Sequence, residues 1–244
     1  GAGIAATDLV MSRSEGHLVI KINDPGNPAA TDQITIENWE NSQYRIEQVQ
    51  FADGTTLTAD NLTNQSLTGT DGADVITLWS DATWADGRGG NDTINSGSTN
   101  ATLYGGDGND TINDGNGSDT IDGGAGDDVI TDQGNGSNIL LGGDGNDTVT
   151  FSYQANNTID GGSGDDLIKV NAPYGYNSTN TVAGGTGNDR IQSGSSVDTY
   201  LFNRGDGQDT ISDDDYYGQN KTDKIVLGAG IAATDLVMSR SEGH

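Results

Sequence analysis

Eight aspartates recur along the chain at intervals of 18 to 23 residues, each as the sixth residue of a glycine-rich nonapeptide. They are Asp74, Asp92, Asp110, Asp128, Asp147, Asp166, Asp189 and Asp209. If these nonapeptides stack, their carboxylates form a column with a spacing of about 4.8 Å, the distance between paired strands. Carboxylates so close together repel strongly unless a cation lies between them. Since Ca²⁺ takes roughly six to eight oxygen ligands, carbonyls as well as carboxylates, the column predicts a row of calcium sites.

The type of acid and the glycines fit the same chemistry. Every acid inside the repeated tract is an aspartate, whereas all glutamates lie outside it, at Glu15, Glu37, Glu40, Glu47 and Glu242. A short side chain suits a fixed site close to the backbone, where a longer one would overshoot. Glycine reaches the backbone angles that turn carbonyl groups inward toward an ion.

Each nonapeptide divides into six turn residues and three residues with an apolar one in the middle, as in GGDGNDTIN from Gly105. Such triplets are typical of short strands, and glycine-rich sextets are typical of turns. A weaker nonapeptide, such as DGNGSDTID from Asp114, lies between successive strong ones. We call the turns of the strong nonapeptides odd turns and those of the weaker ones even turns. Two nonapeptides complete one coil, so the sequence predicts an all-β fold, a right-handed parallel β-roll of stacked nonapeptides.

The apolar residues in the middle of the triplets should point into the coil. After the odd turns they are Ile76, Ile94, Ile112, Ile130, Val149, Ile168, Ile191 and Ile211. After the even turns they are Leu103, Ile121, Leu140, Ile159, Val182 and Tyr200. A core one residue thick per strand is too small to offset the chain entropy alone. We therefore expect folding to require bound calcium.

The even turns depart from the aspartate pattern. Their sixth positions are Thr83, Ala101, Asp119, Asn138, Asn157, Asn180 and Asp198, and only two of these are acids. This edge of the coil is expected to be largely free of metal and held by hydrogen bonds of Asn and Thr. Asp119 with Asn138 stays open as one weak site.

The strong nonapeptide follows the pattern G-G-x-G-x-D-x-U-x, in which U is a large apolar residue. From Gly69 to about Ser212 the chain resembles the RTX, or haemolysin-type, calcium-binding repeat proteins. The resemblance implies an ion between one odd turn and the next. The first turn supplies its aspartate and the carbonyls of positions two and four, and the next turn supplies its aspartate and the carbonyls of positions one and three. For the central site these ligands are Gly106, Gly108, Asp110, Gly123, Ala125 and Asp128.

Eight odd turns leave seven gaps, so the resemblance implies about seven Ca²⁺ ions on this edge. The carbonyl donors that it implies for the other six gaps are Thr70, Gly72, Gly87, Gly89, Arg88, Gly90, Gly105, Asp107, Gly124, Gly126, Gly142, Asp144, Gly143, Gly145, Gly161, Ser163, Gly162, Gly164, Gly184, Thr186, Gly185, Gly187, Arg204 and Asp206.

The segments on either side of the repeated tract do not follow the nonapeptide pattern. Residues 8–52 alternate between apolar and polar and contain the turn signals EGH and NDPGNP. They predict an antiparallel β element over residues 1–60 that caps or joins a roll over residues 61–212. Trp39, Tyr44 and Phe51 are expected to bury its face against the end of the roll. Residues 199–227 followed by 1–58 also resemble the haemolysin-type calcium-binding-related segment that flanks such repeats.

Residues 1–17, GAGIAATDLVMSRSEGH, recur letter for letter at 228–244. The identity indicates a tandem array of units of about 227 residues, or a chain designed to mimic one. Residues 213–244 would then begin the cap of the next unit. Neighbouring units of the same chain are the expected partners.

The composition excludes several classes of protein. With 37 acids against 10 bases and a net charge of −27, binding to nucleic acid or anionic lipid is not expected. The absence of cysteine excludes disulfides, thiolate metal sites and cysteine nucleophiles. No run of apolar residues is long enough to span a membrane. Calcium ligation accounts for the in-phase aspartates, and no GxSxG, HExxH or phosphate-loop motif is present, so we expect no enzyme.

These observations predict a calcium-dependent spacer unit of a large secreted or cell-surface bacterial repeat protein, such as an adhesin, matrix or S-layer-like component. The resemblance implies type I secretion and an extracellular location. One alternative is the calcium-binding carrier domain of a secreted enzyme or toxin. Another is a carbohydrate- or ice-binding module, and cell-surface or matrix glycans are considered as further partners. Glycans would use an aromatic face of Trp79, Trp84, Tyr104, Tyr153, Tyr174, Tyr176, Tyr216 and Tyr217, whereas only Thr186 with Asn188 fits an ice-binding array.

Overall fold

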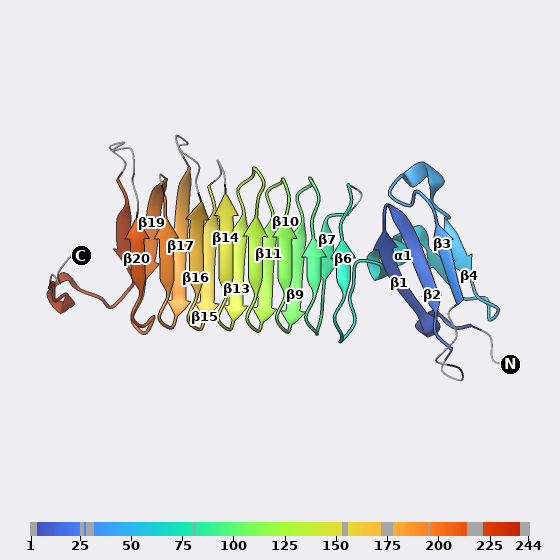
Figure 1. Cartoon of the computed structure of the whole chain (residues 1–244), viewed down its shortest axis with the longest axis horizontal. Coiled ribbons are helices and arrows are strands. Elements are labelled where there is room, and N and C mark those ends of the chain that lie inside the picture. Colours follow the sequence, from blue (N-terminus) through green and yellow to red (C-terminus); the bar gives the residue numbers. More distant parts are fainter. Residues whose placement is uncertain are drawn as a thin grey trace.

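The apolar triplets of the nonapeptides form short strands that stack in register into two parallel sheets of eight strands each. In this computed structural model the roll carries a small antiparallel β element at its N-terminal end (Figure 1). The structure describes residues 4–24, 27, 32–80, 82–152, 156–171, 178–194, 196–213 and 222–239. The all-β class, the parallel roll and the antiparallel sheet at the N-terminus are confirmed.

Strands after odd turns make one sheet and strands after even turns make the other. The first sheet contains β6 (Val75–Thr77), β8 (Thr93–Asn95), β10 (Thr111–Asp114), β12 (Val129–Asp132), β14 (Thr148–Ser152), β16 (Leu167–Asn171), β18 (Arg190–Ser193) and β20 (Thr210–Asp213). The second contains β7 (Trp84–Asp86), β9 (Thr102–Asp107), β11 (Thr120–Ala125), β13 (Ile139–Asp144), β15 (Thr158–Ser163), β17 (Thr179–Thr186), β19 (Val197–Phe202) and β21 (Lys224–Leu227). Equivalent residues of successive coils pair, as Ile112 does with Ile94 and Ile130.

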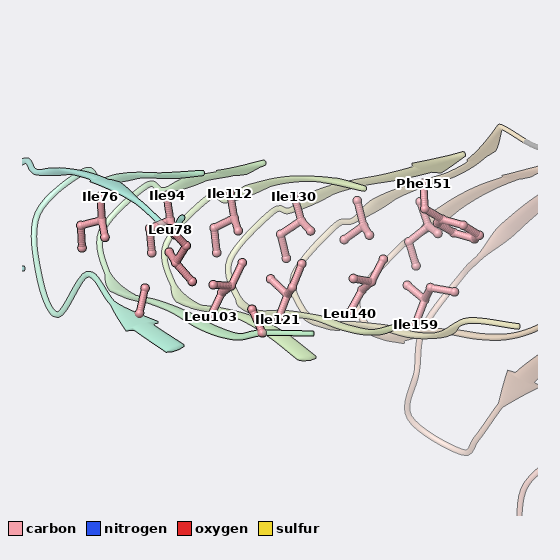
Figure 2. Packing of buried hydrophobic residues seen from close by; sticks show 14 of the residues in the cluster. Ile76, Leu78, Ile94, Leu103, Ile112, Ile121, Ile130, Leu140, Phe151 and Ile159 are labelled. Atoms are coloured by element: carbon pink, nitrogen blue, oxygen red, sulfur yellow. The ribbon is translucent and has the colours of Figure 1, made fainter. Parts of the chain in front are cut away.

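The core of the roll consists of two facing rows of apolar side chains, one from each sheet. Figure 2 shows Ile76, Ile94, Ile112 and Ile130 along one row, opposite Leu103, Ile121, Leu140 and Ile159. All but Ile76 and Ile159 of these eight have no exposed surface. Because each strand contributes one inward residue to the rows, the core is long and thin, as expected from the triplets.

The parallel sheets run on beyond residue 212. Strand β21 pairs with β19, although no glycine-rich nonapeptide precedes β21 in the sequence. A 3₁₀ turn, η3 (Ala233–Asp235), follows it. Ile211 belongs to the inward row by sequence, but it is 36% exposed because β20 is the edge strand of its sheet among the described residues. Within the part of the chain that the structure describes, the roll therefore ends in an exposed apolar surface.

The N-terminal element, which we call the cap, covers residues 4–65. It begins with a 3₁₀ turn, η1 (Ala6–Asp8), and the antiparallel strands β1 (Leu9–Ser14), β2 (His17–Ile22) and β3 (Asp32–Ile36). The 3₁₀ turn η2 (Ser42–Tyr44), a hairpin of β4 (Gln48–Gln50) and β5 (Thr56–Thr58), and helix α1 (Ala59–Gln65) complete it. Thr58 caps the helix, since its hydroxyl accepts a hydrogen bond from the backbone amide of Asn61.

The prediction for the aromatic residues of the cap is partly wrong. Trp39 and Phe51 are buried, but Trp39 packs in the cap's own core with Met11, Leu18 and Leu62, not against the apolar rows of the roll. Tyr44 is 61% exposed, because it lies in the surface turn η2. The cap thus has a separate hydrophobic core of its own.

Of the aromatic residues considered for glycan binding, Trp79, Trp84 and Tyr104 lie within the described residues. Trp84 packs against the core of the roll, while Tyr104 is exposed on β9. Tyr153, Tyr174, Tyr176, Tyr216 and Tyr217 lie outside the residues that the structure describes. Within the described chain, no helix is long and apolar enough to cross a membrane.

Candidate metal centre

The odd turns bring their aspartates together in a continuous ladder along one edge of the roll, which we call the odd edge. In the central part, the backbone amide of Asp110 donates a hydrogen bond of 2.7 Å to Oδ1 of Asp128. The same bond, at 2.7 to 3.1 Å, links every successive pair from Asp74 to Asp209. Each aspartate after the first therefore uses Oδ1 to hold the preceding turn in register.

The second carboxylate oxygen is left over. Oδ2 is buried without a hydrogen-bond partner in Asp92, Asp110, Asp128, Asp147, Asp166 and Asp189. These residues are only 1–2% exposed. A buried carboxylate oxygen that lacks a partner costs free energy, and the cost is larger for a charged group. The ladder therefore presents a row of buried oxygens that need a cation.

Glycine at position one of the odd turns leaves the space for that cation. A Cβ placed on Gly105 would lie 2.3 Å from the carbonyl oxygen of Gly123 and 2.5 Å from Oδ2 of Asp110. Both oxygens therefore surround the same point, between one odd turn and the next. They are two of the ligands expected for the central site.

The carbonyls of positions two and four also point toward the next turn. A Cβ on Gly124 would lie 2.1 Å from the carbonyl oxygen of Gly106, and one on Gly126 would lie 2.2 Å from that of Gly108. The carbonyl of Ala125, at position three, accepts a hydrogen bond of 2.6 Å from the amide of Gly108. Because a carbonyl oxygen has two lone pairs, this bond leaves one available to an ion.

Burial changes the protonation of the odd-edge aspartates. It raises the pKa of Asp128 and Asp166 to about 7 and that of Asp92 and Asp147 to about 6. For Asp128 the charges of Asp147 and Asp110 raise the pKa further, although the hydrogen bond from the Asp110 amide opposes the shift. The protein alone therefore disfavours the ionised column, and a bound cation would reverse that preference.

The two ends of the ladder differ from its middle. At the first turn, Oδ2 of Asp74 accepts hydrogen bonds from the amide (2.6 Å) and hydroxyl (2.8 Å) of Thr70, so it is already satisfied. At the last turn, Asp209 is only partly buried. Five gaps are flanked on both sides by an unpartnered Oδ2, from Asp92/Asp110 to Asp166/Asp189. The two terminal gaps have such an oxygen on one side only, so we expect weaker ion sites there than in the five inner gaps.

The donor set suits a hard cation that accepts backbone oxygens. Within the described ranges, no three His, Cys, Asp or Glu side chains converge on one point. Each gap instead combines two aspartates with carbonyl groups. Such all-oxygen sets fit Ca²⁺, whereas zinc favours nitrogen and sulfur ligands. The residues present therefore fit the expected calcium.

The even turns form a similar ladder from asparagine. The amide of Asp119 donates 2.8 Å to Oδ1 of Asn138, the amide of Asn138 donates 2.8 Å to Asn157, and that of Asn157 donates 3.2 Å to Asn180. An asparagine side chain holds the turns in register as an aspartate does, but it presents a nitrogen donor in place of the second oxygen. These bonds agree with an edge held by hydrogen bonds, but Oδ2 of Asp119 is buried without a partner, as on the odd edge.

Two buried acids at the even edge were not predicted from the nonapeptide pattern. Asp114 is 5% exposed and lies against Asp119, and its Oδ1 accepts hydrogen bonds from the hydroxyl of Ser96 (2.8 Å) and the amide of Gly115 (2.9 Å). Asp132, in the paired position of the next coil, is 1% exposed. Burial raises the pKa of Asp114 to about 7 and that of Asp132 to about 6. The sequence did contain a signal for Asp114, because this acid occupies position one of an even nonapeptide, where the odd turns have glycine.

Two family models match the chain. The RTX calcium-binding nonapeptide repeat matches residues 61–94, 84–103, 95–130, 132–150, 153–172 and 174–211, together more than half of the sequence. The chain belongs to the RTX family. The haemolysin-type calcium binding protein related domain matches residues 17–61, which cover most of the cap. No curated protein and no solved structure matches the chain. This RTX chain is therefore a calcium-binding repeat protein, whose ladder of aspartates follows the repeats.

Proposed function

We propose that this RTX chain is a calcium-dependent spacer unit of a secreted or cell-surface repeat protein, which becomes a rigid rod when it meets extracellular calcium. The observation that carries the proposal is the row of six buried Oδ2 atoms without a hydrogen-bond partner on the odd edge. RTX repeats are typical of secreted proteins. Extracellular calcium modules bind their ion at ~10⁻⁴–10⁻³ M, so such a unit would fold after export.

The energetics support coupling between folding and ion binding. The roll has a core one residue thick per strand and carries much of a net charge of −27. Calcium between the odd turns would neutralise the buried carboxylates and join each coil to the next. Because the complete ligand sets exist only in the stacked roll, binding free energy becomes folding free energy.

The uniform architecture supports a structural role over a catalytic one. The two parallel sheets continue without interruption from β6 and β7 to β20 and β21. The odd-edge aspartates are engaged in register-holding bonds, and their spare oxygens face the gaps between turns. A rod whose stiffness comes from ions at each coil suits the spacing of functional parts along a long surface protein.

The test is a calcium titration of the 244-residue chain followed by circular dichroism and calorimetry. The expected result is a disordered spectrum in chelator and a cooperative gain of β structure in millimolar Ca²⁺, but not in equal Mg²⁺. Calorimetry should find five tighter ions and up to two weaker ones. A chain that is equally folded in strong chelator would overturn the proposal.

A further inference from the structure

The duplicated segment adopts the same local conformation at both ends of the chain. In the first copy, Oδ2 of Asp8 accepts a hydrogen bond of 2.8 Å from the amide of Ala5. In the second copy, Oδ2 of Asp235 accepts one of 3.0 Å from the amide of Ala232. The backbone angles of the two capping residues agree, with φ/ψ of −102/162° and −99/156°. The local sequence therefore specifies this turn in both surroundings. The second copy also shows the path of the segment directly after the last strand of a roll.

The end of the roll forms direct hydrogen bonds with the second copy of the duplicated segment. The amide of Gly228 extends the ladder of β21 by a hydrogen bond of 2.9 Å to the carbonyl of Phe202. Nε and Nη2 of Arg204 then donate to the carbonyl of Gly230 at 3.1 and 2.7 Å, and Nη2 also donates to Oδ2 of Asp235 at 2.7 Å. Arg204 occupies position one of the last odd turn, where every other odd turn begins with glycine. Its side chain thus bridges the roll to the start of the following segment.

Two apolar surfaces are left uncovered by the residues that the structure describes. The open end of the roll exposes Ile211 (36%), Ile225 (60%) and Val226 (40%). The inner face of the cap contains a groove of about 340 Å³ whose walls include Ile4, Leu9, Ile22 and Ile34. Ile4 and Ile34 are 49% and 51% exposed, although the same face is fully buried nearer Trp39. The groove is therefore the part of the cap's hydrophobic core that reaches the surface.

The duplication places these two surfaces next to each other. Ile231 is the second-copy equivalent of Ile4, a wall of the groove, and follows Leu227 by four residues, which span at most about 14 Å. The bonds of Arg204 hold Gly230 and Asp235 on either side of Ile231. A cap completed after residue 244 would therefore have its groove at the open end of the preceding roll.

We propose that the end of each roll docks into the apolar groove of the next copy's cap, and that the Arg204–Asp235 bridge clamps this junction. Consecutive units then form one continuous rod with no flexible linker. This inference rests on the proposed spacer function, because it requires copies in tandem. The occupant of the groove is a copy of this chain, since the segment that builds its wall emerges from that copy's last strand.

The experiment uses a two-copy chain, residues 1–227 followed by residues 1–244, in millimolar calcium. Small-angle X-ray scattering should show a stiff rod with a maximum dimension about double that of the 244-residue chain, as for a solenoid that grows in one dimension. Ile34→Asp in the second copy should give a bent, flexible pair. The same substitution in the first copy, whose groove has no preceding copy, is the matched control and should leave the rod straight.

A second readout tests the clamp in the 244-residue chain itself. Arg204→Ala should speed hydrogen exchange at the amides of residues 229–235 by about threefold or more, the range expected for an exposed ion pair with added hydrogen bonds. Arg190→Ala, an arginine on β18, should not.

If both copies fold in calcium yet the wild-type pair behaves as freely jointed beads, the junction is wrong while the spacer function stands. If Ile34→Asp acts equally in both copies, or single units pair side by side through the groove, the proposed occupant is wrong. If the single unit does not fold in calcium, the spacer function itself fails.

Discussion

The backbone amide of Asp92 donates a hydrogen bond of 2.7 Å to Oδ1 of Asp110, one coil further along the roll. This bond divides the carboxylate between two tasks. Oδ1 holds the register of the preceding turn, and Oδ2 remains buried and available to an ion. Because the arrangement repeats along the odd edge, we propose that the same side chains that align the coils also make their alignment dependent on calcium.

Removing one Oδ2 while keeping Oδ1 should separate these tasks. Asp128→Asn should preserve the bond from the Asp110 amide, as asparagine does on the even edge, but remove a ligand from two adjacent gaps. We expect calorimetry to count two fewer tight ions. The calcium concentration at half-folding should rise about tenfold, which corresponds to about 1.4 kcal/mol.

Asp127→Asn is the matched control, since Asp127 is adjacent, exposed and also accepts a backbone hydrogen bond through Oδ1. This substitution makes the same change in net charge but alters no carboxylate that faces a gap between odd turns. Equal effects of the two substitutions would show that general charge, not ligation, controls folding.

The glycines at position two should resist substitution where the turns stack. Gly124 has a φ of +106°, and an added Cβ would lie 2.1 Å from the carbonyl oxygen of Gly106. Gly124→Ala should destabilise the calcium-loaded roll by more than about 2 kcal/mol, from backbone strain and displacement of a ligand carbonyl. Urea unfolding in saturating calcium measures the change.

Gly72→Ala serves as its comparison, because a Cβ there would meet no atom closer than 3.8 Å. Its effect should remain within about 0.5 kcal/mol. A tolerated alanine at residue 124 would mean that the turns do not stack as closely as described.

The raised pKa values predict opposite responses to pH with and without calcium. Burial raises the pKa of Asp128 and Asp166 from 3.8 to about 7, so the folded state binds protons more tightly than the unfolded chain. In chelator, any stability of the roll should be greatest below pH 4 and be lost as the pH rises through about 7. In calcium, protons compete with the ion, so the calcium midpoint should rise as the pH falls from 7 to 5.

Circular dichroism across this pH range, with and without chelator, measures both responses. Two curves with the same sign would contradict the assignment of these carboxylates to the ion sites. Magnesium at matched ionic strength controls for screening of the surface charge.

The even edge offers a test of the expectation that it is largely free of metal. Asp114→Asn should keep the oxygen that accepts from Ser96 and place an amide donor against the unpartnered Oδ2 of Asp119. We expect the calcium-free state to gain about 1 kcal/mol and the number of bound ions to stay unchanged. Asp122→Asn, on the outer face of β11, has the same charge change and should do neither. Loss of one bound ion in Asp114→Asn would place a calcium site on this edge.

Much of the roll was predictable from local pattern. The nine-residue period places Ile112 under Ile94 and Asp110 beside Asp92 without knowledge of distant contacts, because each coil meets only its neighbours. The cap was less predictable. Helix α1 and the hairpin of β4 and β5 follow no repeat, and the exposure of Tyr44 depends on how a surface turn packs.

The sequence by itself determined the coil, the two apolar rows and the column of aspartates, since these follow from a period that every coil repeats. Only the tertiary structure decided which oxygen of each carboxylate is spare, that Thr70 satisfies Asp74, and that Asp114 lies against Asp119. It also decided that Arg204 reaches Asp235 across 31 residues. These relationships depend on the directions of side chains in the stacked turns, and a one-dimensional period carries no information about direction.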